Sequence, residues 1–184
     1  MSDVAETLLH QARDGDREAA GQLITLFYER IYAYLRRQCG HDEDAADLTQ
    51  RTFTKAWTSL GSFAGRSSVS TWLHGIAHHT FLDWRRQQKP VTQPDEAWWE
   101  SRADDSPGPS AAAAERDLSR HVCALVAQLD DDVRHTVHLH YFQSLSIAET
   151  AAVLNIATST VKYRVRQALD FLRARMAEPK GQPR

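Results

Sequence analysis

A polar and basic cluster lies near the C-terminal end of the chain. In the stretch LNIATSTVKYRVRQAL, residues 154–169, the side chains of Lys162, Tyr163, Arg164 and Arg166 fall within five positions. Ammonium and guanidinium groups bind phosphate, and a guanidinium also donates two parallel hydrogen bonds to the edge of a guanine base. These residue types therefore indicate nucleic-acid binding, if a helix places them on one exposed side.

The residues upstream predict the element that positions this cluster. Ser146 and Glu149, in the sequence SIAE, form a capping box, in which the two residues satisfy each other's free backbone donors and start a helix. Asn155 tolerates the left-handed conformation that ends this helix and turns the chain. A second helix begins at ATST, so the pattern predicts a helix-turn-helix.

The second helix of this motif has two different sides. At about 100° per residue, its apolar side comprises Val161, Val165, Ala168, Leu169 and Leu172. The outer side comprises Ser159, Tyr163 and Arg166, flanked by Thr160, Lys162 and Gln167. Asp170 also lies on the outer side and repels phosphate, so we expect DNA contact from the first two turns only.

The charges are segregated along the chain, although the net charge of its 184 residues is only −2. Residues 61–89 and 133–184 carry net charges of +3 and +5, whereas residues 1–60 and 90–132 carry −3 and −7. Two basic blocks separated by an acidic stretch predict two surfaces that meet phosphate.

The composition predicts a folded, all-α protein of two small helical domains. Hydrophobic residues make up 42% of the chain and charged residues 25%, which is ordinary for a globular protein. Residues 90–114 contain four prolines, five acidic residues and no periodicity, so we expect a flexible acidic linker there. One domain covers residues 1–89 and the other residues 115–178, and the alternation typical of strands is absent from both.

Helical periodicity predicts four helices before the linker. Asp16 caps the second helix and Gly40 ends it. The third helix covers residues 41–60, and the fourth covers about residues 70–88. The residues expected to point inward are Leu23, Phe27, Ile31, Tyr34 and Leu35 in the second helix, Leu48, Phe53, Ala56, Trp57 and Leu60 in the third, and Trp72, Leu73, Ile76 and Ala77 in the fourth.

Three stretches, taken in order, resemble one known family. DAADLTQRTFTKAW, STWLHGIAHHTFLDWRR and LSIAETAAVLNIATSTVKYRV are similar to the polymerase-binding, promoter-melting and upstream-element motifs of bacterial extracytoplasmic-function sigma factors. The resemblance implies that residues 1–89 are sigma region 2, which binds the polymerase clamp and melts the minus-ten element. It implies that residues 115–178 are sigma region 4, which binds the minus-thirty-five element.

The resemblance also assigns site residues. Those implied for polymerase binding are Asp47, Gln50 and Arg51, where Arg51 departs from the acidic residue usual in the family. Those implied for the minus-ten element are Arg66, Ser67, Ser68, Trp72, His78, His79, Arg85 and Arg86, where His78 and His79 replace the usual arginine and asparagine. Lys89 is a further candidate for phosphate binding. Those expected at the minus-thirty-five element are Ser159, Thr160, Lys162, Tyr163 and Arg166.

The partners implied are core RNA polymerase, promoter DNA and a separate anti-sigma protein, because the short tail after Met176 leaves no room for a regulatory domain. No apolar run of membrane-spanning length and no signal peptide occur, so we expect a cytoplasmic protein. Cys39 and Cys123 are far apart and predict free thiols. We expect no cofactor.

The linker carries a hypothesis of its own. Its acidic residues are expected to follow the basic RNA path of the polymerase, with two tryptophans as anchors, while a plain soluble tether is the alternative. These residues are Asp95, Glu96, Glu100, Asp104 and Asp105, with Trp98 and Trp99.

Two other classes of function stay open at this point. A stand-alone helix-turn-helix regulator would bind an operator as a dimer without polymerase. A metal sensor would use the histidines at positions 74, 78, 135, 138 and 140, although exposed helix histidines are the simpler explanation. Enzyme motifs such as a phosphate-cradling glycine loop, HExxH or a nucleophile elbow are absent from the sequence.

Overall fold

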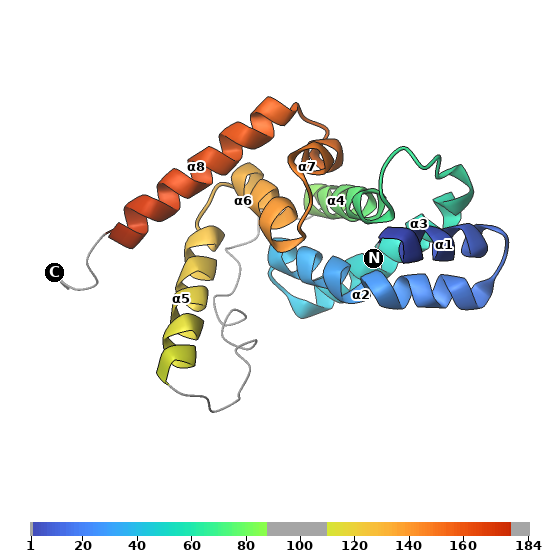
Figure 1. The fold of residues 1–184 in the computed structure, drawn as a ribbon, viewed down its shortest axis with the longest axis horizontal. Coiled ribbons are helices and arrows are strands. Elements are labelled where there is room, and N and C mark those ends of the chain that lie inside the picture. Colours follow the sequence, from blue (N-terminus) through green and yellow to red (C-terminus); the bar gives the residue numbers. More distant parts are fainter. Residues whose placement is uncertain (1, 88–109, 178–184) are drawn as a thin grey trace.

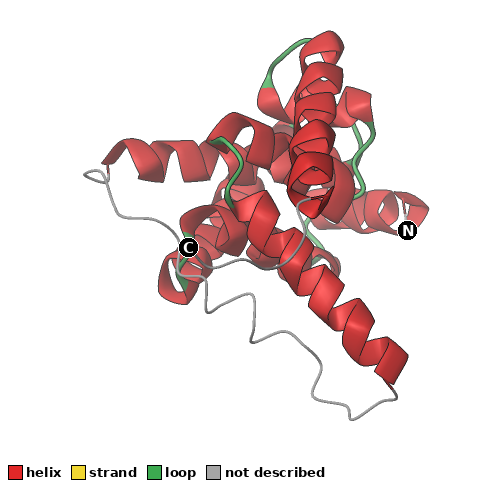
Figure 2. Cartoon of the chain, turned by 90° about the vertical axis from the view of Figure 1, so that its left-hand side faces the viewer, coloured by secondary structure: helices red, strands yellow, loops and turns green. Residues whose placement is uncertain are grey.

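The chain folds into helices (Figures 1 and 2). The computed structural model describes residues 2–87 and 110–177, and the regular elements in these ranges are all helical, which confirms the all-α prediction for them. In chain order they are α1 (Ser2–Arg13), α2 (Arg17–Cys39), α3 (Asp42–Ser59), the 3₁₀ turn η1 (Leu60–Ser62), α4 (Val69–Gln87), α5 (Ser110–Ala127), α6 (Asp131–Val137), the π-helical turn η3 (His138–Phe142), α7 (Ile147–Leu154) and α8 (Thr158–Ala177).

Local capping signals set the ends of α2, as the sequence predicts. The carboxylate of Asp16 accepts hydrogen bonds from the backbone N–H groups of Glu18 and Ala19, at 2.8 and 3.2 Å. Gly40 ends the helix in the left-handed region, with a φ of 83°, which glycine adopts without steric cost. The chain can then turn directly into α3.

The first four helices surround an apolar core. The five residues of α2 predicted to point inward are all buried, with Ile31, Tyr34 and Leu35 fully inaccessible to solvent. Leu48 of α3 and Leu73 of α4 pack against them. Since full burial of one such side chain stabilises a fold by about 1.5–3 kcal/mol, this core fixes α3 and α4 relative to each other.

The prediction that Trp57 points inward is wrong, because its side chain is 50% exposed. The inward side of α3 is taken instead by Thr49 and Thr52, which are fully buried. Their hydroxyls donate to the carbonyls of Ala45 and Leu48 in their own helix, both at 2.7 Å. A threonine satisfied in this way can occupy a core position, and Trp57 is displaced to the rim.

The helix-turn-helix forms as predicted. Ser146 and Glu149 make both hydrogen bonds of the capping box at the start of α7. Asn155 ends α7 with φ 53° and ψ 47°, in the left-handed region. On the following helix α8, Val161 and Ala168 are buried while Tyr163 is exposed, so the predicted helical phase is confirmed.

The helices after the linker do not pack only on one another. Val126, Leu129, Val133, Val137 and Ala168 form a small core of α5, α6 and α8. Three further apolar residues, Leu139, Leu145 and Val153, join the core of the first four helices. Consequently α7 lies against α4, and α8 runs away from the contact (Figure 1).

The predicted linker lies largely outside the described residues, as do Lys89, the five linker acids and Trp98 and Trp99. Helix α5 begins at Ser110, which falls within the predicted range of residues 90–114.

Candidate nucleic-acid interface

The outer side of α8 is exposed and basic. Ser159, Lys162, Tyr163 and Arg166 are all exposed, with Tyr163 at 66%, and Thr160 is half-buried beside them. Lys162 and Arg166 form no ion pair with any described residue, so their charges stay available. The residues also lie in the first half of a 20-residue helix, where a helix-turn-helix contacts base edges.

Arg164 serves a different purpose from its basic neighbours. Its side chain is only 17% exposed and forms an ion pair with Asp132 of α6. This contact ties α8 to α6 and turns the arginine away from the outer side. The sequence cluster therefore divides into one internal arginine and two outward cations.

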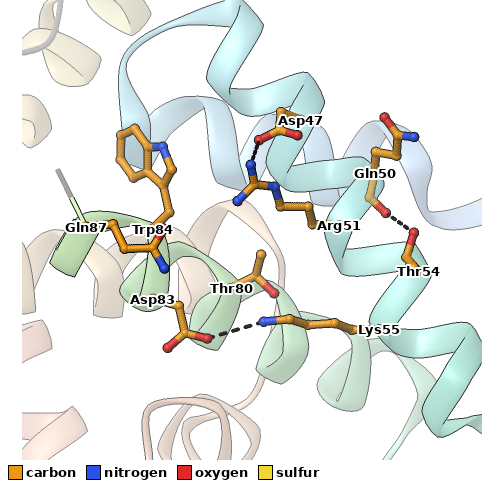
Figure 3. A pocket seen from close by; sticks show the side chains of 9 residues that line it. All are labelled: Asp47, Gln50, Arg51, Thr54, Lys55, Thr80, Asp83, Trp84 and Gln87. Carbon is orange, nitrogen blue, oxygen red and sulfur yellow. Dashed lines mark hydrogen bonds and ion pairs between the residues drawn. The ribbon is translucent and has the colours of Figure 1, made fainter.

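A polar groove runs between α3 and α4 (Figure 3). On its α3 side, Asp47 and Arg51 form an ion pair of 2.7 Å, and exposed Gln50 lies one turn away. Across the groove, Lys55 reaches Asp83 of α4 at 3.3 Å. The three residues implied for polymerase binding thus lie together on one exposed surface, and Arg51 partly neutralises Asp47.

The loop between α3 and α4 carries three candidate residues for the minus-ten element, two of which are exposed while the third is held by hydrogen bonds. Arg66 and Ser67 are exposed. Ser68 is half-buried. Its hydroxyl accepts from the backbone N–H of Thr71 at 3.2 Å and donates to the Glu149 carboxylate at 2.9 Å. Ser68 therefore caps α4 and also contacts the helix-turn-helix.

Trp72 is half-buried on α4, and its ring lies 5.0 Å from that of Phe63. The contact between these two rings joins the start of the loop to α4. Further along α4, Arg85 pairs with Asp131 of α6 at 2.8 Å, and Arg86 lies 3.6 Å from Asp83. Both arginine side chains stay substantially exposed, at 45% and 73%.

The two neighbouring histidines of α4 lie in different environments. His79 is exposed, whereas His78 is buried and its Nδ1 lies 3.0 Å from the hydroxyl of Tyr34. Burial lowers the pKa of His78 to about 4, so its ring is neutral at neutral pH. His78 therefore contributes packing in this conformation, and the expectation that it faces DNA does not match its position.

The expectation that the other histidines are exposed is also wrong for three of them. His74, His135 and His138 are buried, and desolvation lowers the pKa of each. The ring of His74 lies against that of Tyr34 of α2, and the ring of His135 lies against those of His78 and Phe81 of α4. The ring of His138 lies against that of Phe142. Within the described residues, no three histidine, cysteine, aspartate or glutamate side chains are placed to share a metal ion.

Three further findings concern the cysteines, the contacts between distant helices and the length of the helices. Cys39 is buried and Cys123 half-buried, and both are free thiols, as predicted. The sequence does not reveal the contacts that Glu149, Thr71 and Asp131 make with distant helices. The presence of each residue type is already explained within its own helix, as by the capping box for Glu149, so it does not indicate a distant partner. Among the described helices, none is long and apolar enough to cross a lipid bilayer.

Comparison with known proteins assigns the two halves of the chain. Residues 23–91 match the family model described as Sigma-70 region 2, and residues 123–172 match Sigma-70, region 4. The RNA polymerase sigma factor YlaC of Bacillus subtilis is 32% identical, over 91% of this chain and 98% of that protein. The ECF RNA polymerase sigma factor SigW of the same organism is 27% identical, over 97% of this chain and 100% of that protein.

A solved structure shares the fold. The sigma factor RpoE, in complex with the anti-sigma factor NepR from Bartonella quintana, superposes with a TM-score of 0.64 at 21% identity, covering 86% of this chain and 98% of that one. The matched relatives span both basic helical units and the segment between them. The chain therefore belongs to the extracytoplasmic-function family of RNA polymerase sigma factors, the subunits that direct core polymerase to specific promoters and initiate transcription.

Proposed function

We propose that the two helical units of this sigma factor divide promoter recognition between them. Residues 1–89 bind the polymerase clamp and open the minus-ten element, residues 115–178 bind the minus-thirty-five element, and residues 90–114 connect the two. The observation that carries this proposal is the exposed outer side of α8, where Lys162 and Arg166 form no ion pair with another described residue. The preceding helix α7 has the capping box and the left-handed C-terminal residue of a helix-turn-helix. Such a helix reads DNA but has no means of carrying out chemistry on it.

At the minus-thirty-five element, the outer side of α8 lies in the major groove. Arg166, at the centre of this side, donates two hydrogen bonds to a guanine. Lys162 and Thr160 lie at its flank and bind phosphate, while Ser159 and Tyr163 contact base edges.

At the polymerase, Asp47, Gln50 and Arg51 bind a helix of the clamp. Their exposure on one side of α3 supports this role, and the groove toward α4 offers further polar partners. The 2.7 Å pair between Asp47 and Arg51 must open or be shared when a basic partner approaches Asp47.

At the minus-ten element, Arg66, Ser67 and Ser68 form a pocket for a base flipped out of the melted strand. Flipping costs a few kcal/mol, which hydroxyl and backbone donors offset. Trp72 supports this pocket, and His79, Arg85 and Arg86 bind the adjoining phosphates. For His78 we propose a supporting role through Tyr34 rather than DNA contact.

We further propose that a separate anti-sigma protein regulates this chain in the cytoplasm, where bacterial polymerase works. The fold of RpoE, solved with NepR, supports an anti-sigma partner. The chain has no catalytic role of its own, since nucleotide addition belongs to the polymerase.

Reconstituted transcription tests the proposal. Purified core polymerase and this chain are combined on a genomic promoter library, and start sites are mapped. We expect promoter-specific starts that depend on the chain. Tight operator binding without polymerase, and no starts with it, would support a stand-alone regulator instead.

A further inference from the structure

The groove between α3 and α4 contains a buried hydroxyl that no described residue satisfies (Figure 3). Thr80 of α4 lines this groove and is only 3% exposed, and its Oγ1 atom has no hydrogen-bond partner among the described residues. Thr49 and Thr52 of α3 are also buried, but their hydroxyls donate to carbonyls four residues earlier in their own helix. Because a buried polar group without a partner costs free energy, Thr80 marks a place where a partner from outside the chain can bind.

Carboxylates line both walls of this groove, and each already holds a cation of the chain itself. On α3, Asp47 pairs with Arg51 at 2.7 Å. On α4, Asp83 lies 3.6 Å from Arg86 of its own helix and pairs across the groove with Lys55 at 3.3 Å. The side chains of the Asp47–Arg51 and Lys55–Asp83 pairs are about half exposed, and ion pairs this exposed contribute little to stability. An external cation can therefore replace either internal one at small cost.

The size and lining of the groove limit what can enter it. Its cavity has a volume of about 440 Å³, which accommodates one long side chain. A whole helix does not fit, since an α-helix with its side chains is about 10–12 Å across. Gln50, Trp84 and Gln87 complete the lining and add two amides and an indole ring. Phosphate is disfavoured, because carboxylates on both walls repel it.

A guanidinium matches this set of groups well. Its five N–H donors lie in one plane and can serve a carboxylate and a neighbouring hydroxyl together, whereas an ammonium is a compact point charge. A guanidinium also stacks on aromatic rings, and Trp84 supplies one here. The Arg51 side chain at Asp47 shows that the groove binds such a group within the chain itself.

We infer that the groove between α3 and α4 receives an arginine side chain of the polymerase clamp, which displaces Lys55 from Asp83 and donates a hydrogen bond to Oγ1 of Thr80. This inference rests on the proposed function, in which the α3 side of the groove binds a helix of the clamp. It extends the polymerase site from α3 onto α4. In the free chain, Lys55 occupies the carboxylate that the arginine takes, so it competes with the polymerase.

Two substitutions in the full chain test the inference. Thr80→Val keeps the shape of the side chain and removes the hydroxyl, so it should weaken binding to core polymerase roughly tenfold, the factor that a hydrogen bond to a charged group contributes. It should not lower the stability of the free chain, because this hydroxyl has no partner among the described residues to lose. Lys55→Gln removes the competing cation and should strengthen core binding by up to about fivefold, the factor for an exposed ion pair.

The matched controls change the same kinds of group outside the groove. Thr52→Val removes a buried hydroxyl that donates to the carbonyl of Leu48 at 2.7 Å, so it should lower stability and leave the affinity for core polymerase unchanged. Arg17→Gln removes an exposed positive charge at the start of α2 and should leave that affinity unchanged as well. Fluorescence anisotropy of the labelled chain titrated with core polymerase measures the affinity, and urea denaturation measures the stability.

Each substitution has a result that overturns the inference. For Thr80→Val, these results are an unchanged affinity, an equal loss of affinity in Thr52→Val, or a loss of stability, which would reveal a partner within the free chain. For Lys55→Gln, the result is an affinity that stays the same or falls.

Two further outcomes separate the inference from the proposed function. If Thr80→Val binds core polymerase normally and instead weakens the binding of holoenzyme to promoter DNA, the groove serves DNA and the inference is wrong. If the unchanged chain does not bind core polymerase, the proposed function fails together with the inference. Failure of the substitutions alone leaves the proposed function standing.

Discussion

Arg164 of α8 forms an ion pair with Asp132 of α6, and this contact fixes which side of α8 faces away from the protein. Arg166, two positions later, is exposed as a result. Two arginines of the same short cluster are thus expected to give different phenotypes when replaced.

Arg164→Ala should lower stability and leave DNA sequence preference unchanged. Because the arginine is mostly buried and its partner is exposed, we expect a loss of about 1 kcal/mol in the free energy of unfolding. Urea denaturation followed by circular dichroism measures it. Arg173→Ala is the control, since that exposed arginine makes only a 3.4 Å contact with Asp170 on its own helix.

Lys162→Ala should weaken binding to all DNA sequences to a similar extent. A single lost phosphate contact reduces the slope of log affinity against log salt by about one. Titrating a fragment with the preferred upstream element and a scrambled fragment at several salt concentrations measures this slope. A loss confined to the preferred element would instead place Lys162 at a base.

Asn155→Ala should destabilise the turn between α7 and α8. The residue has a φ of 53°, and a left-handed conformation costs a residue with a Cβ about 1–2 kcal/mol, less for asparagine than for alanine. We expect Asn155→Gly to be tolerated, because glycine adopts this conformation freely. Thermal melting of the two variants compares them, and equal melting temperatures would show that the turn bears no strain.

Stability should fall as the pH drops from about 6.5 toward 4. Burial first, and then the charges of His79 and Arg85, lower the pKa of His78 to about 4, while Asp132 acts in the opposite direction. The unfolded chain therefore binds a proton in this range that the folded chain does not, and each such histidine contributes a slope of at most about 1.4 kcal/mol per pH unit.

His78→Gln should accordingly flatten this dependence between pH 6.5 and 4. His79→Gln, at the exposed neighbouring position, is the matched control. Urea midpoints measured across the range give the slope for each protein. An equal slope in the unchanged chain and in His78→Gln would contradict the burial of this ring.

The parts of the fold that local chemistry decides could be predicted from the sequence. The helix ends of α2 and α7 are set by residues that act within a few positions of them, namely Asp16, Gly40, Ser146 and Asn155. The types of these residues were therefore enough to predict the helix ends. The phase of α8 followed in the same way from its apolar spacing.

The contacts between distant segments could not be predicted. The burial of His135 and the second role of Glu149 depend on how α4 and the helix-turn-helix pack together, and no local pattern encodes that packing. Trp57 was misplaced for a related reason. Hydrophobicity favoured tryptophan for the core, whereas threonines with satisfied hydroxyls filled it.

The most direct measurement of the central claim, that the outer side of α8 reads the upstream promoter element, is transcription from a panel of promoter variants by core polymerase with this chain. Each base pair of the upstream element is changed in turn, with Arg166→Ala and Arg164→Ala compared against the unchanged protein. We predict that Arg166→Ala loses about 1–3 kcal/mol on the preferred element and discrimination at one base pair, while Arg164→Ala keeps the original preference. Intact preference in Arg166→Ala together with its loss in Arg164→Ala would contradict the assigned side of the helix.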